Sequence, residues 1–376
     1  MCGICGYLSL DGETRARRET VAKMTEAISH RGPDAQGLLV REKIALGHAR
    51  LSILDLRPEA NQPMLSDDGR VALVYNGEVY NFQTLRKRLK ARGARFRTSC
   101  DTEVVLRAYE AYGLDFLSYL RGMFALAIWD GRRERLLLAR DRLGQKPLFY
   151  FADGAAIRFS SELRSLLRDE TIPRRVNGEA VHLYLSLGFV PGDHAILSGV
   201  EKVAPGGYIL VEGGKVKRGR YWHLHYAPAP LAGRGRARQR QSHDLAEELR
   251  ERLAEAVHLR MVSDVPLGAF LSGGLDSSLI VGLMAKASRR PIKTFSIGFE
   301  DRDYSEVQYA RMVARRWQTE HHEEILRPDA AALLPRLVAQ YGEPFADPSA
   351  IPTYLLSEMT RKTVTVALSG DAGDEI

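Results

Sequence analysis

The pattern of apolar segments changes across residues 227–241, and this change constrains the fold more than any other feature. Before it, short apolar runs follow one another closely, and only a few segments have helical periodicity. After it, segments of helical and strand periodicity alternate. A strand-rich chain with few helices predicts layers of sheet and helix, whereas regular alternation predicts a parallel, doubly wound sheet. The two parts of the chain are therefore expected to form different α/β architectures.

The segment between the two patterns reads APAPLAGRGRARQRQ and is rich in Pro, Gly and Arg without periodicity. Such a composition is typical of a surface linker. The length of 376 residues suits two domains, since one domain holds roughly 150 residues. We predict a first domain over residues 2–216, a linker over 217–242 and a second domain over 243–376.

Composition argues against several classes of protein. The sequence has no stretch of about 18 apolar residues and no basic segment followed by an apolar run at its start, so we expect neither a membrane span nor a secretory signal. Three cysteines do not make a disulfide framework, which indicates the reducing cytoplasm. Part of the net charge of +7 lies in the linker, so we expect no nucleic-acid partner.

The chain begins MCGICGY, so removal of Met1 would leave Cys2 as the first residue. A thiol attacks a carbonyl as thiolate and needs a base. A free α-amino group has a pKa of about 7.7 to 8.0, against about 10.4 for lysine, so an N-terminal cysteine carries its own base. The alternatives are a redox or zinc pair with Cys5 and a small buried cysteine. No second C-x-x-C follows, which disfavours zinc. The position of Cys2 alone supports a nucleophile and a buried cysteine equally. We expect Cys5 to be buried, and we assign Cys100 no role.

Polar motifs further along the chain favour the nucleophile. The Asn76-Gly77 pair could form a hairpin turn, but a side-chain amide beside a backbone N–H is also what an oxyanion hole requires. Arg50 can bind a carboxylate through two parallel hydrogen bonds, and Glu78 and Asp101 can hold an ammonium group. Together these groups suit an amino acid that carries a side-chain amide, which describes glutamine.

Seven motifs occur in one order over residues 2 to about 216: MCGICGY, HRGPD, HARLSI, YNGEVYN, DTE, FALAIWD and LARDRLGQKPLFY. This run resembles the glutamine amidotransferase domain of the N-terminal nucleophile (Ntn) type. The resemblance implies a four-layer α/β/β/α sandwich in which Cys2 attacks the glutamine amide and Asn76 and Gly77 stabilise the oxyanion. It also implies a glutamine site made of Arg50, Leu51, Ser52, Ile53, Leu54, Asn76, Gly77, Glu78 and Asp101. Because the amine serves as base, we interpret His30 and His48 as structural.

A second site is indicated by FLSGGLDSS at residues 270–278, where a predicted strand runs into a helix. Glycines at such a turn expose N–H groups, and a helix N-terminus attracts anions. Asp276 is suited to hold Mg²⁺ between phosphates. The loop lacks the P-loop pattern G-x-x-x-x-G-K-S/T, and an ordinary tight turn is the alternative.

The full string SGGLDSS resembles the pyrophosphate loop of ATP pyrophosphatases, whose fold is adenine nucleotide α-hydrolase-like, and ALSGDAGDE resembles their second acidic loop. This resemblance implies that Asp276 and Asp374 bind Mg²⁺ and that Asp371 takes part in adenylate formation. EPFADPSAIPTYLLSEM resembles the acceptor side of that family. Family members continue beyond the acidic loop, so we expect either a fragment or a second domain that is incomplete at its C-terminus. The implied ATP contacts are Leu271, Ser272, Gly273, Gly274, Asp276, Ser277, Ile297, Ser369 and Gly370.

A glutamine-hydrolysing domain joined to an AMP-forming domain resembles the glutamine-hydrolysing asparagine synthetase family over essentially the whole chain. The resemblance implies a ligase of asparagine biosynthesis that uses glutamine, aspartate and ATP with Mg²⁺. Three alternatives stay open: the same chemistry on another carboxylate, a glutaminase whose second domain is inactive, and a binding module without catalysis. We leave a homodimer open and interpret His321-His322 as a strand edge, since no third metal ligand follows at a suitable spacing.

Overall fold

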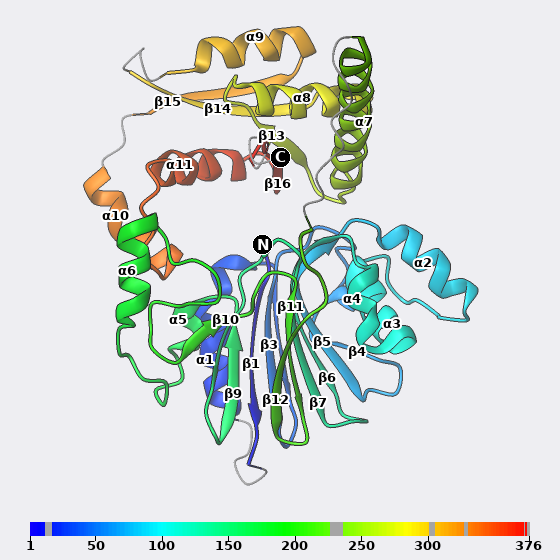
Figure 1. Cartoon of the computed structure of the whole chain (residues 1–376), viewed down its shortest axis with the longest axis vertical. Coiled ribbons are helices and arrows are strands. Elements are labelled where there is room, and N and C mark those ends of the chain that lie inside the picture. Colours follow the sequence, from blue (N-terminus) through cyan, green and yellow to red (C-terminus); the bar gives the residue numbers. More distant parts are fainter. Residues whose placement is uncertain (12–16, 226–235, 301–304, 327–329, 372, 374–376) are drawn as a thin grey trace. The chain divides into compact units, whose positions relative to one another are not determined.

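A computed structural model shows that the chain forms two compact units (Figure 1). The first comprises Met1–Leu224 together with Val338–Asp347, and the second comprises His225–Leu337 and Pro348–Ile376. Within the part of the chain that the structure describes, no helix is both long and apolar enough to cross a membrane. The described residues are 1–11, 17–225, 236–300, 305–326, 330–371 and 373.

Two six-stranded antiparallel sheets form the core of the first unit. Their strands are β1 (Gly3–Ser9), β2 (Ala35–Val40), β3 (Ile44–Arg50), β4 (Met64–Leu65), β5 (Val71–Val79), β6 (Gly122–Asp130), β7 (Arg135–Arg140), β8 (Phe149–Ala152), β9 (Ala156–Ser160), β10 (Val200–Lys202), β11 (Gly207–Glu212) and β12 (Lys215–Arg220). The first sheet has the order β10-β8-β9-β1-β3-β2, and the second has the order β12-β11-β7-β6-β5-β4.

Helices cover the outer face of each sheet. Apolar side chains of α1 (Arg18–Ala27) and α5 (Leu163–Leu166) pack on the first sheet, and those of α2 (Phe82–Ala91) and α3 (Asp101–Tyr112) pack on the second. The unit also contains α4 (Phe116–Tyr119) and α6 (Gly178–Leu187). A third apolar cluster joins the inner faces of the two sheets. The layers are helix, sheet, sheet and helix, which confirms the predicted four-layer α/β sandwich.

Strand β1 shows how the sequence produces this layering. Ile4 and Leu8 belong to the apolar cluster between the sheets, whereas Cys5 and Tyr7 belong to the cluster under α1. Side chains alternate between the two faces of a strand, and both faces of β1 are covered, so every residue of β1 is buried. The expected burial of Cys5 is therefore confirmed.

The second unit is built around a four-stranded parallel sheet in the order β15-β14-β13-β16. Helices α9 and α11 lie on opposite sides of this sheet (Figure 1), which confirms the predicted doubly wound architecture. Because the order reverses between β13 and β16, ligands are expected beyond the carboxyl ends of these strands. The elements are α7 (Arg236–Arg260), β13 (Leu267–Phe270), α8 (Leu275–Ala287), β14 (Lys293–Phe299), α9 (Val307–Trp317), β15 (Glu320–Leu326), α10 (Ala330–Tyr341), α11 (Ala350–Arg361) and β16 (Val366–Leu368).

The element boundaries differ from the predicted linker at both ends. β12 pairs with β11 along its whole length, so residues 217–220 belong to the first unit. α7 begins at Arg236, before the predicted domain start, because Arg, Ala and Gln are good helix formers. The stretch between them, residues 226–235, lies outside the described residues. Sequence patterns also missed α10 and α11, which contain the helix-disfavouring residues Pro335 and Pro352.

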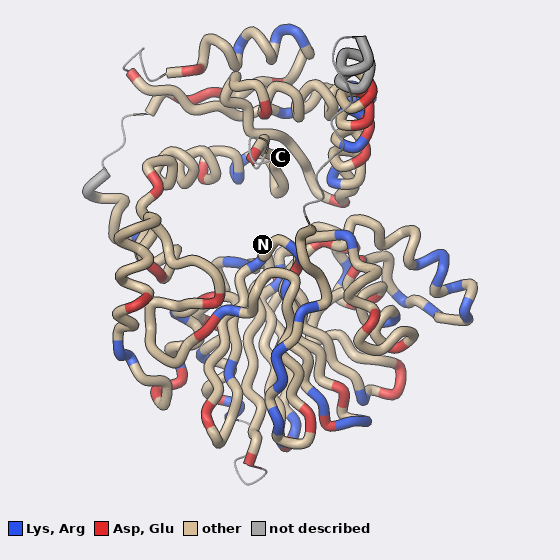
Figure 2. The backbone as a smooth tube through the Cα atoms, viewed as in Figure 1, with Lys and Arg blue, Asp and Glu red and all other residues tan. Residues whose placement is uncertain are grey.

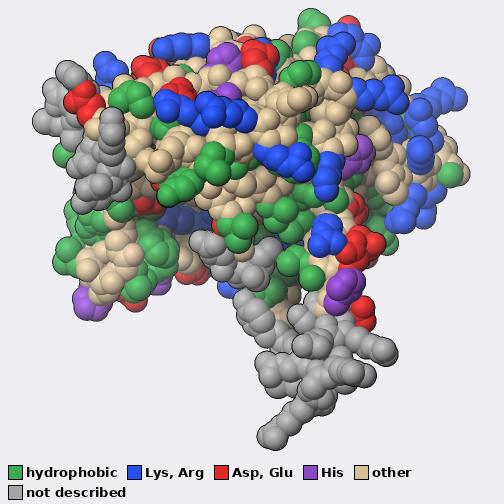
Figure 3. Space-filling model, turned by 90° about the horizontal axis from the view of Figure 1, so that it is seen from above, with side chains coloured by type: hydrophobic (Ala, Val, Ile, Leu, Met, Phe, Trp, Pro, Cys, Tyr) green, Lys and Arg blue, Asp and Glu red, His purple; other side chains and the backbone are tan. Residues whose placement is uncertain are grey.

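Charged residues lie at the periphery of the first unit. They gather on α2, on β12 and near the ends of the strands, away from the middle of the sheets (Figure 2). On the molecular face shown in Figure 3, basic side chains lie among acidic and apolar ones. Charged groups buried inside the first unit are therefore exceptions to the pattern, and each needs a specific partner or a function.

Candidate active site

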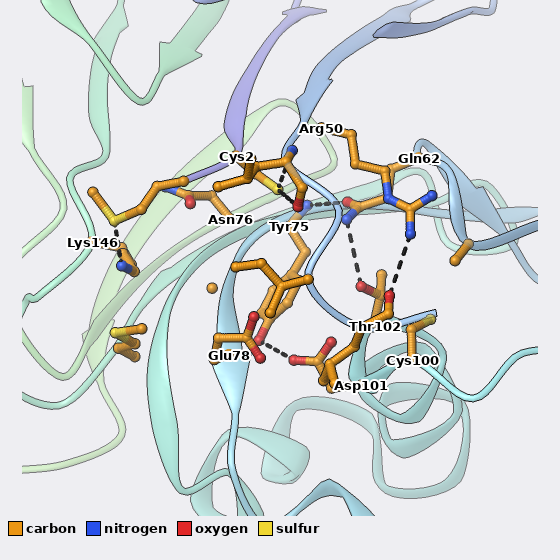
Figure 4. A pocket seen from close by; sticks show the side chains of 17 residues that line it. Cys2, Arg50, Gln62, Tyr75, Asn76, Glu78, Cys100, Asp101, Thr102 and Lys146 are labelled. Carbon is orange, nitrogen blue, oxygen red and sulfur yellow. Dashed lines mark hydrogen bonds between the residues drawn. The ribbon is translucent and has the colours of Figure 1, made fainter. Parts of the chain in front are cut away.

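Cys2 and most of the predicted glutamine-binding residues line one pocket of the first unit (Figure 4). The predicted residue that does not line the pocket is Ser52, whose amide donates to Asp34 Oδ2 of the HRGPD motif at 2.7 Å. The predicted residues on the wall are Cys2, Arg50, Leu51, Ile53, Leu54, Asn76, Gly77, Glu78 and Asp101.

Cys2 lies one residue before β1, with its thiol at the pocket wall. Its Sγ accepts a hydrogen bond from the Leu51 amide at 3.4 Å and lies 3.6 Å from the Leu51 carbonyl oxygen. Burial raises the pKa of the Cys2 thiol, and the hydrogen bond to Leu51 opposes part of that rise. A thiol with a raised pKa is a poor nucleophile, so attack by this sulfur requires a base.

Asn76 and Gly77 lie inside β5, where they pair with β6, so they do not form the hairpin turn that the sequence left open. Asn76 is 1% exposed, and its Nδ2 has no hydrogen-bond partner among the residues that the structure describes. A Cβ atom on Gly77 would lie 2.3 Å from the Met123 carbonyl oxygen, so β6 can approach only a glycine here. An unpaired buried donor is unfavourable, which indicates that the Asn76 amide awaits a ligand atom.

Glu78 and Asp101 bring two carboxylates into the same pocket, one half-buried and one buried. Asp101 is the first residue of α3, and its Oδ2 accepts hydrogen bonds from the Tyr75 hydroxyl at 2.8 Å and the Val79 amide at 2.9 Å. Burial and then the charge of Asp101 raise the pKa of Glu78 well above its usual value. Burial also raises the pKa of Asp101, although its two donors oppose the rise. Two carboxylates held this way favour a cation between them.

The Arg50 guanidinium organises the loop that forms one side of the pocket. Its Nη1 donates to the Arg57 carbonyl oxygen at 3.0 Å and to Asn61 Oδ1 at 2.6 Å. Its Nη2 donates to the carbonyl oxygens of Leu54 at 3.3 Å and Asp55 at 2.5 Å. Arg50 was predicted to bind a carboxylate; in this structure it holds the loop and places a positive charge at the pocket wall.

Eight further residues line the pocket and were not predicted: Met1, Ala60, Gln62, Tyr75, Cys100, Thr102, Met123 and Lys146. The buried Lys146 ammonium donates to the Met1 thioether at 2.6 Å, and burial lowers the pKa of Lys146 to about 8. Tyr75 and Lys146 belong to two motifs noted in the sequence, YNGEVYN and LARDRLGQKPLFY. The motifs themselves do not reveal that these side chains reach one pocket.

The two histidines of the first unit's motifs have structural surroundings. His48 is buried with its Nε2 3.2 Å from the Tyr75 carbonyl oxygen, and burial lowers the pKa of His48 to about 3. His30 Nε2 lies 3.0 Å from a carboxylate oxygen of Glu162. Neither histidine lines the pocket, in agreement with their interpretation as structural residues.

The predicted ATP-binding residues other than Gly273 line a second pocket, beyond the carboxyl ends of β13 and β16. Gly273 has a φ of +94°, and a Cβ atom there would lie 2.5 Å from the Ala310 amide nitrogen, so this turn requires glycine. Asp374, the second predicted metal ligand, lies outside the described residues. Thr353 and Leu356 of α11 also line the pocket and were not predicted. The predicted residues on its wall are Leu271, Ser272, Gly274, Asp276, Ser277, Ile297, Ser369, Gly370 and Asp371.

Asp276 lies against the acidic loop that follows β16. A Cβ atom on Gly370 would lie 2.6 Å from the Ser277 amide nitrogen, and one on Gly373 would lie 2.5 Å from the Asp276 carboxyl carbon. The turn after β13 and the loop after β16 therefore pack closely, and Asp276 and Asp371 face one pocket.

Comparison with known proteins divides the chain similarly. A family model described as glutamine amidotransferase domain matches residues 1–222, and one described as asparagine synthase matches residues 248–376. A Methanocaldococcus jannaschii protein, provisionally named glutamine-hydrolysing asparagine synthetase 2, is 38% identical over 401 residues, covering 100% of this chain and 75% of that protein. Glutamine-hydrolysing asparagine synthetase 1 of Bacillus subtilis is 37% identical over 380 residues, covering 100% of this chain and 58% of that protein.

A relative with a different name is amidase chry2 of Gibberella zeae. It is 34% identical over 305 residues, covering 78% of this chain and 44% of that protein. The chain therefore spans between 44% and 75% of the length of these three relatives.

Proposed function

Since the chain belongs to the glutamine-hydrolysing asparagine synthetase family, we propose that its first unit hydrolyses glutamine with Cys2 as nucleophile. The observation that carries this proposal is one pocket that holds a thiol, an unpaired buried amide donor, the buried carboxylate of Asp101 and the half-buried carboxylate of Glu78. The carboxylates suit the α-ammonium group of an amino acid, and the thiol and amide donor suit attack on a side-chain amide.

Binding orients the substrate amide toward the thiol. The glutamine ammonium group lies against the carboxylates of Glu78 and Asp101, which otherwise repel each other. The substrate carboxylate lies toward the positive charge of Arg50. With both ends of the amino acid held, its side chain extends across the pocket to Cys2, and the reaction becomes effectively unimolecular.

The reaction then proceeds through a thioester. The Cys2 thiol gives its proton to the α-amine that removal of Met1 frees, and the sulfur bonds to the amide carbon. The carbonyl oxygen becomes an oxyanion and accepts hydrogen bonds from Asn76 Nδ2 and the Gly77 amide. The amide nitrogen takes a proton and leaves as ammonia. Water hydrolyses the thioester to glutamate and restores the thiol.

We further propose that the second unit adenylates aspartate. The amides of residues 272–274 and the N-terminus of α8 suit the phosphates of ATP. Mg²⁺ would neutralise phosphate charge here, and the carboxylates of Asp276 and Asp374 would hold it. Asp371 lines the same pocket as Asp276, which suits its role in adenylate formation. The aspartate side-chain carboxylate displaces pyrophosphate from the α-phosphate, and ammonia then displaces AMP to give asparagine.

The test is incubation with glutamine, aspartate and Mg-ATP, with glutamate, AMP and asparagine measured together. We expect glutamate in every case, and AMP and asparagine in equal amounts if the second unit is competent in this chain. Glutamate without AMP would restrict the function to glutaminase. Absence of glutamate from protein that has lost Met1 would reject the proposal.

A second candidate function is the same chemistry on a carboxylate acceptor other than aspartate. The observation that favours it is the G. zeae relative, which is named an amidase and not an asparagine synthetase. In this case AMP formation would depend on a carboxylate other than aspartate. Screening a panel of carboxylic acids for AMP release in the presence of glutamine distinguishes the two acceptors.

A further inference from the structure

The backbone of Cys2 lies outside the sheet that it adjoins. The pairing of β1 with β3 begins at Gly3, opposite Ala49, so no ladder hydrogen bond fixes the residue before it. Terminal residues fray unless other contacts hold them. A nucleophile at this position therefore needs an anchor from elsewhere in the fold.

Two side chains supply that anchor in series. Arg31 Nε donates to the Cys2 carbonyl oxygen at 2.9 Å, and Arg31 Nη1 donates to Glu162 Oε1 at 2.8 Å. The Arg31 and Glu162 side chains are each 9% exposed, so water competes little for either bond. Arg164 Nε also donates to Glu162, at 2.5 Å, and its charge helps to keep the carboxylate ionised.

The turn that carries Glu162 also holds the start of β1. The Ser161 amide donates to the Ile4 carbonyl oxygen at 2.9 Å, and the Ile4 amide donates to Ser161 Oγ at 3.0 Å. Residues 161–162 thus hold the start of the chain at two residues: Ile4 directly, and Cys2 through Arg31. Neither residue lines the pocket, so they act on the backbone of the nucleophile and not on the substrate.

We propose that Glu162 is a positioning residue for the nucleophile: it fixes Arg31, and Arg31 fixes the backbone of Cys2 beside the pocket. This inference rests on the proposed glutaminase function. Loss of the Glu162 charge frees Arg31, and the Cys2 peptide then samples orientations in which the sulfur points away from the amide carbon. Because misplacement by about 1 Å can reduce turnover about 100-fold, the effect falls on kcat. The substrate-binding groups stay in place, so KM changes little.

The test compares Glu162→Gln with Asp169→Asn in the full chain. Asp169 is a matched control, because its buried carboxylate accepts from Arg158 Nε at 2.9 Å and does not line the pocket. We expect Glu162→Gln to lower glutaminase kcat about 10- to 100-fold with KM within about threefold. Asp169→Asn should keep wild-type kcat. A glutamine-mimicking diazoketone should label Cys2 of the Glu162 variant more slowly by the same factor.

Arg31→Lys provides a second test that preserves a cation beside Glu162. Lysine lacks the fixed, forked set of donors by which arginine binds the Cys2 carbonyl oxygen and Glu162 together, so we expect the same fall in kcat. When Arg31→Lys is combined with Glu162→Gln, the fall in kcat should be no larger than in either single variant, because both changes break the same chain of contacts. The proposal is overturned if either single variant keeps wild-type kcat and labelling rate, or if the two losses add fully. An inactive wild-type protein would instead reject the proposed function itself.

Discussion

Substitution of Asn76 by alanine should separate catalysis from stability. The Asn76 Nδ2 is buried and has no hydrogen-bond partner among the described residues, so the fold gains nothing from this donor. An unpaired buried polar group costs about 1–3 kcal/mol, and its removal offsets the small void that alanine leaves. We expect the free energy of unfolding of Asn76→Ala to stay within about 1 kcal/mol of wild type.

Catalysis should respond very differently. If Asn76 donates only to the oxyanion, its loss removes an interaction made in the transition state alone. Removal of one such donor typically lowers kcat by about 10²–10³, or about 2.7–4 kcal/mol of transition-state stabilisation. KM for glutamine should change little, because the ground-state amide makes little use of the donor. The assay is steady-state glutamate release, with urea unfolding measured on the same samples.

Asn177→Ala is the matched control for this experiment. Asn177 Oδ1 accepts hydrogen bonds from the Glu179 amide at 3.1 Å and the Ala180 amide at 3.4 Å, which caps α6. Its truncation should lower the free energy of unfolding by about 1 kcal/mol and leave kcat unchanged. The two asparagines should therefore show opposite patterns. An Asn76→Ala protein with kcat within threefold of wild type would refute the assignment of an oxyanion donor.

Three further predictions concern other residues of the two units. The pKa values of Glu78 and Asp101 are raised, so both carboxylates are protonated at a higher pH than usual and then no longer hold the glutamine ammonium group. We expect kcat/KM for glutamine to fall as the pH is lowered toward 4.5. A value of kcat/KM that stays constant down to pH 4.5 would contradict this. Gly273→Ala should weaken ATP binding at least about tenfold, because it adds a Cβ atom to a residue with a φ of +94°. Glutaminase activity should stay unchanged. Titration with a fluorescent ATP analogue measures the change in affinity. Burial lowers the pKa of Lys146 from 10.5 to about 8. Below pH 8 the charged side chain therefore lowers the free energy of unfolding by about 3 kcal/mol, and this cost shrinks as the pH rises to 10.5. Lys146→Met should stabilise the fold at pH 7 and show little gain near pH 10.5 in denaturant unfolding.

Sequence reasoning works best where a residue's local neighbours define its role. The apolar segments around Ile4 and Leu73 lie in strands buried on both faces, so their pattern alone predicts a strand in a layered core. The same holds for the glycine-rich turn at residues 272–274, which follows a strand and opens a helix. These features depend on periodicity and turn chemistry, which a short window contains.

Long-range contacts could not be predicted in this way. Arg31 and Glu162 are separated by 131 positions, and no local pattern pairs them. The bonds from Arg50 to the carbonyl oxygens of Leu54 and Asp55 were also not predicted, because they exist only once that loop is folded. The sequence left open whether Asn76 lies in a turn or a strand, because its strand is set by pairing with β6.

The most direct measurement is glutamate release from glutamine without ATP, using wild type and Cys2→Ala whose N-termini have been checked by intact mass. We predict that wild type lacking Met1 releases glutamate and ammonia in equal amounts, and that Cys2→Ala, equally folded, releases neither. Glutamate release by Cys2→Ala at the wild-type rate, or its absence from folded wild type lacking Met1, would contradict the assignment of Cys2 as the nucleophile.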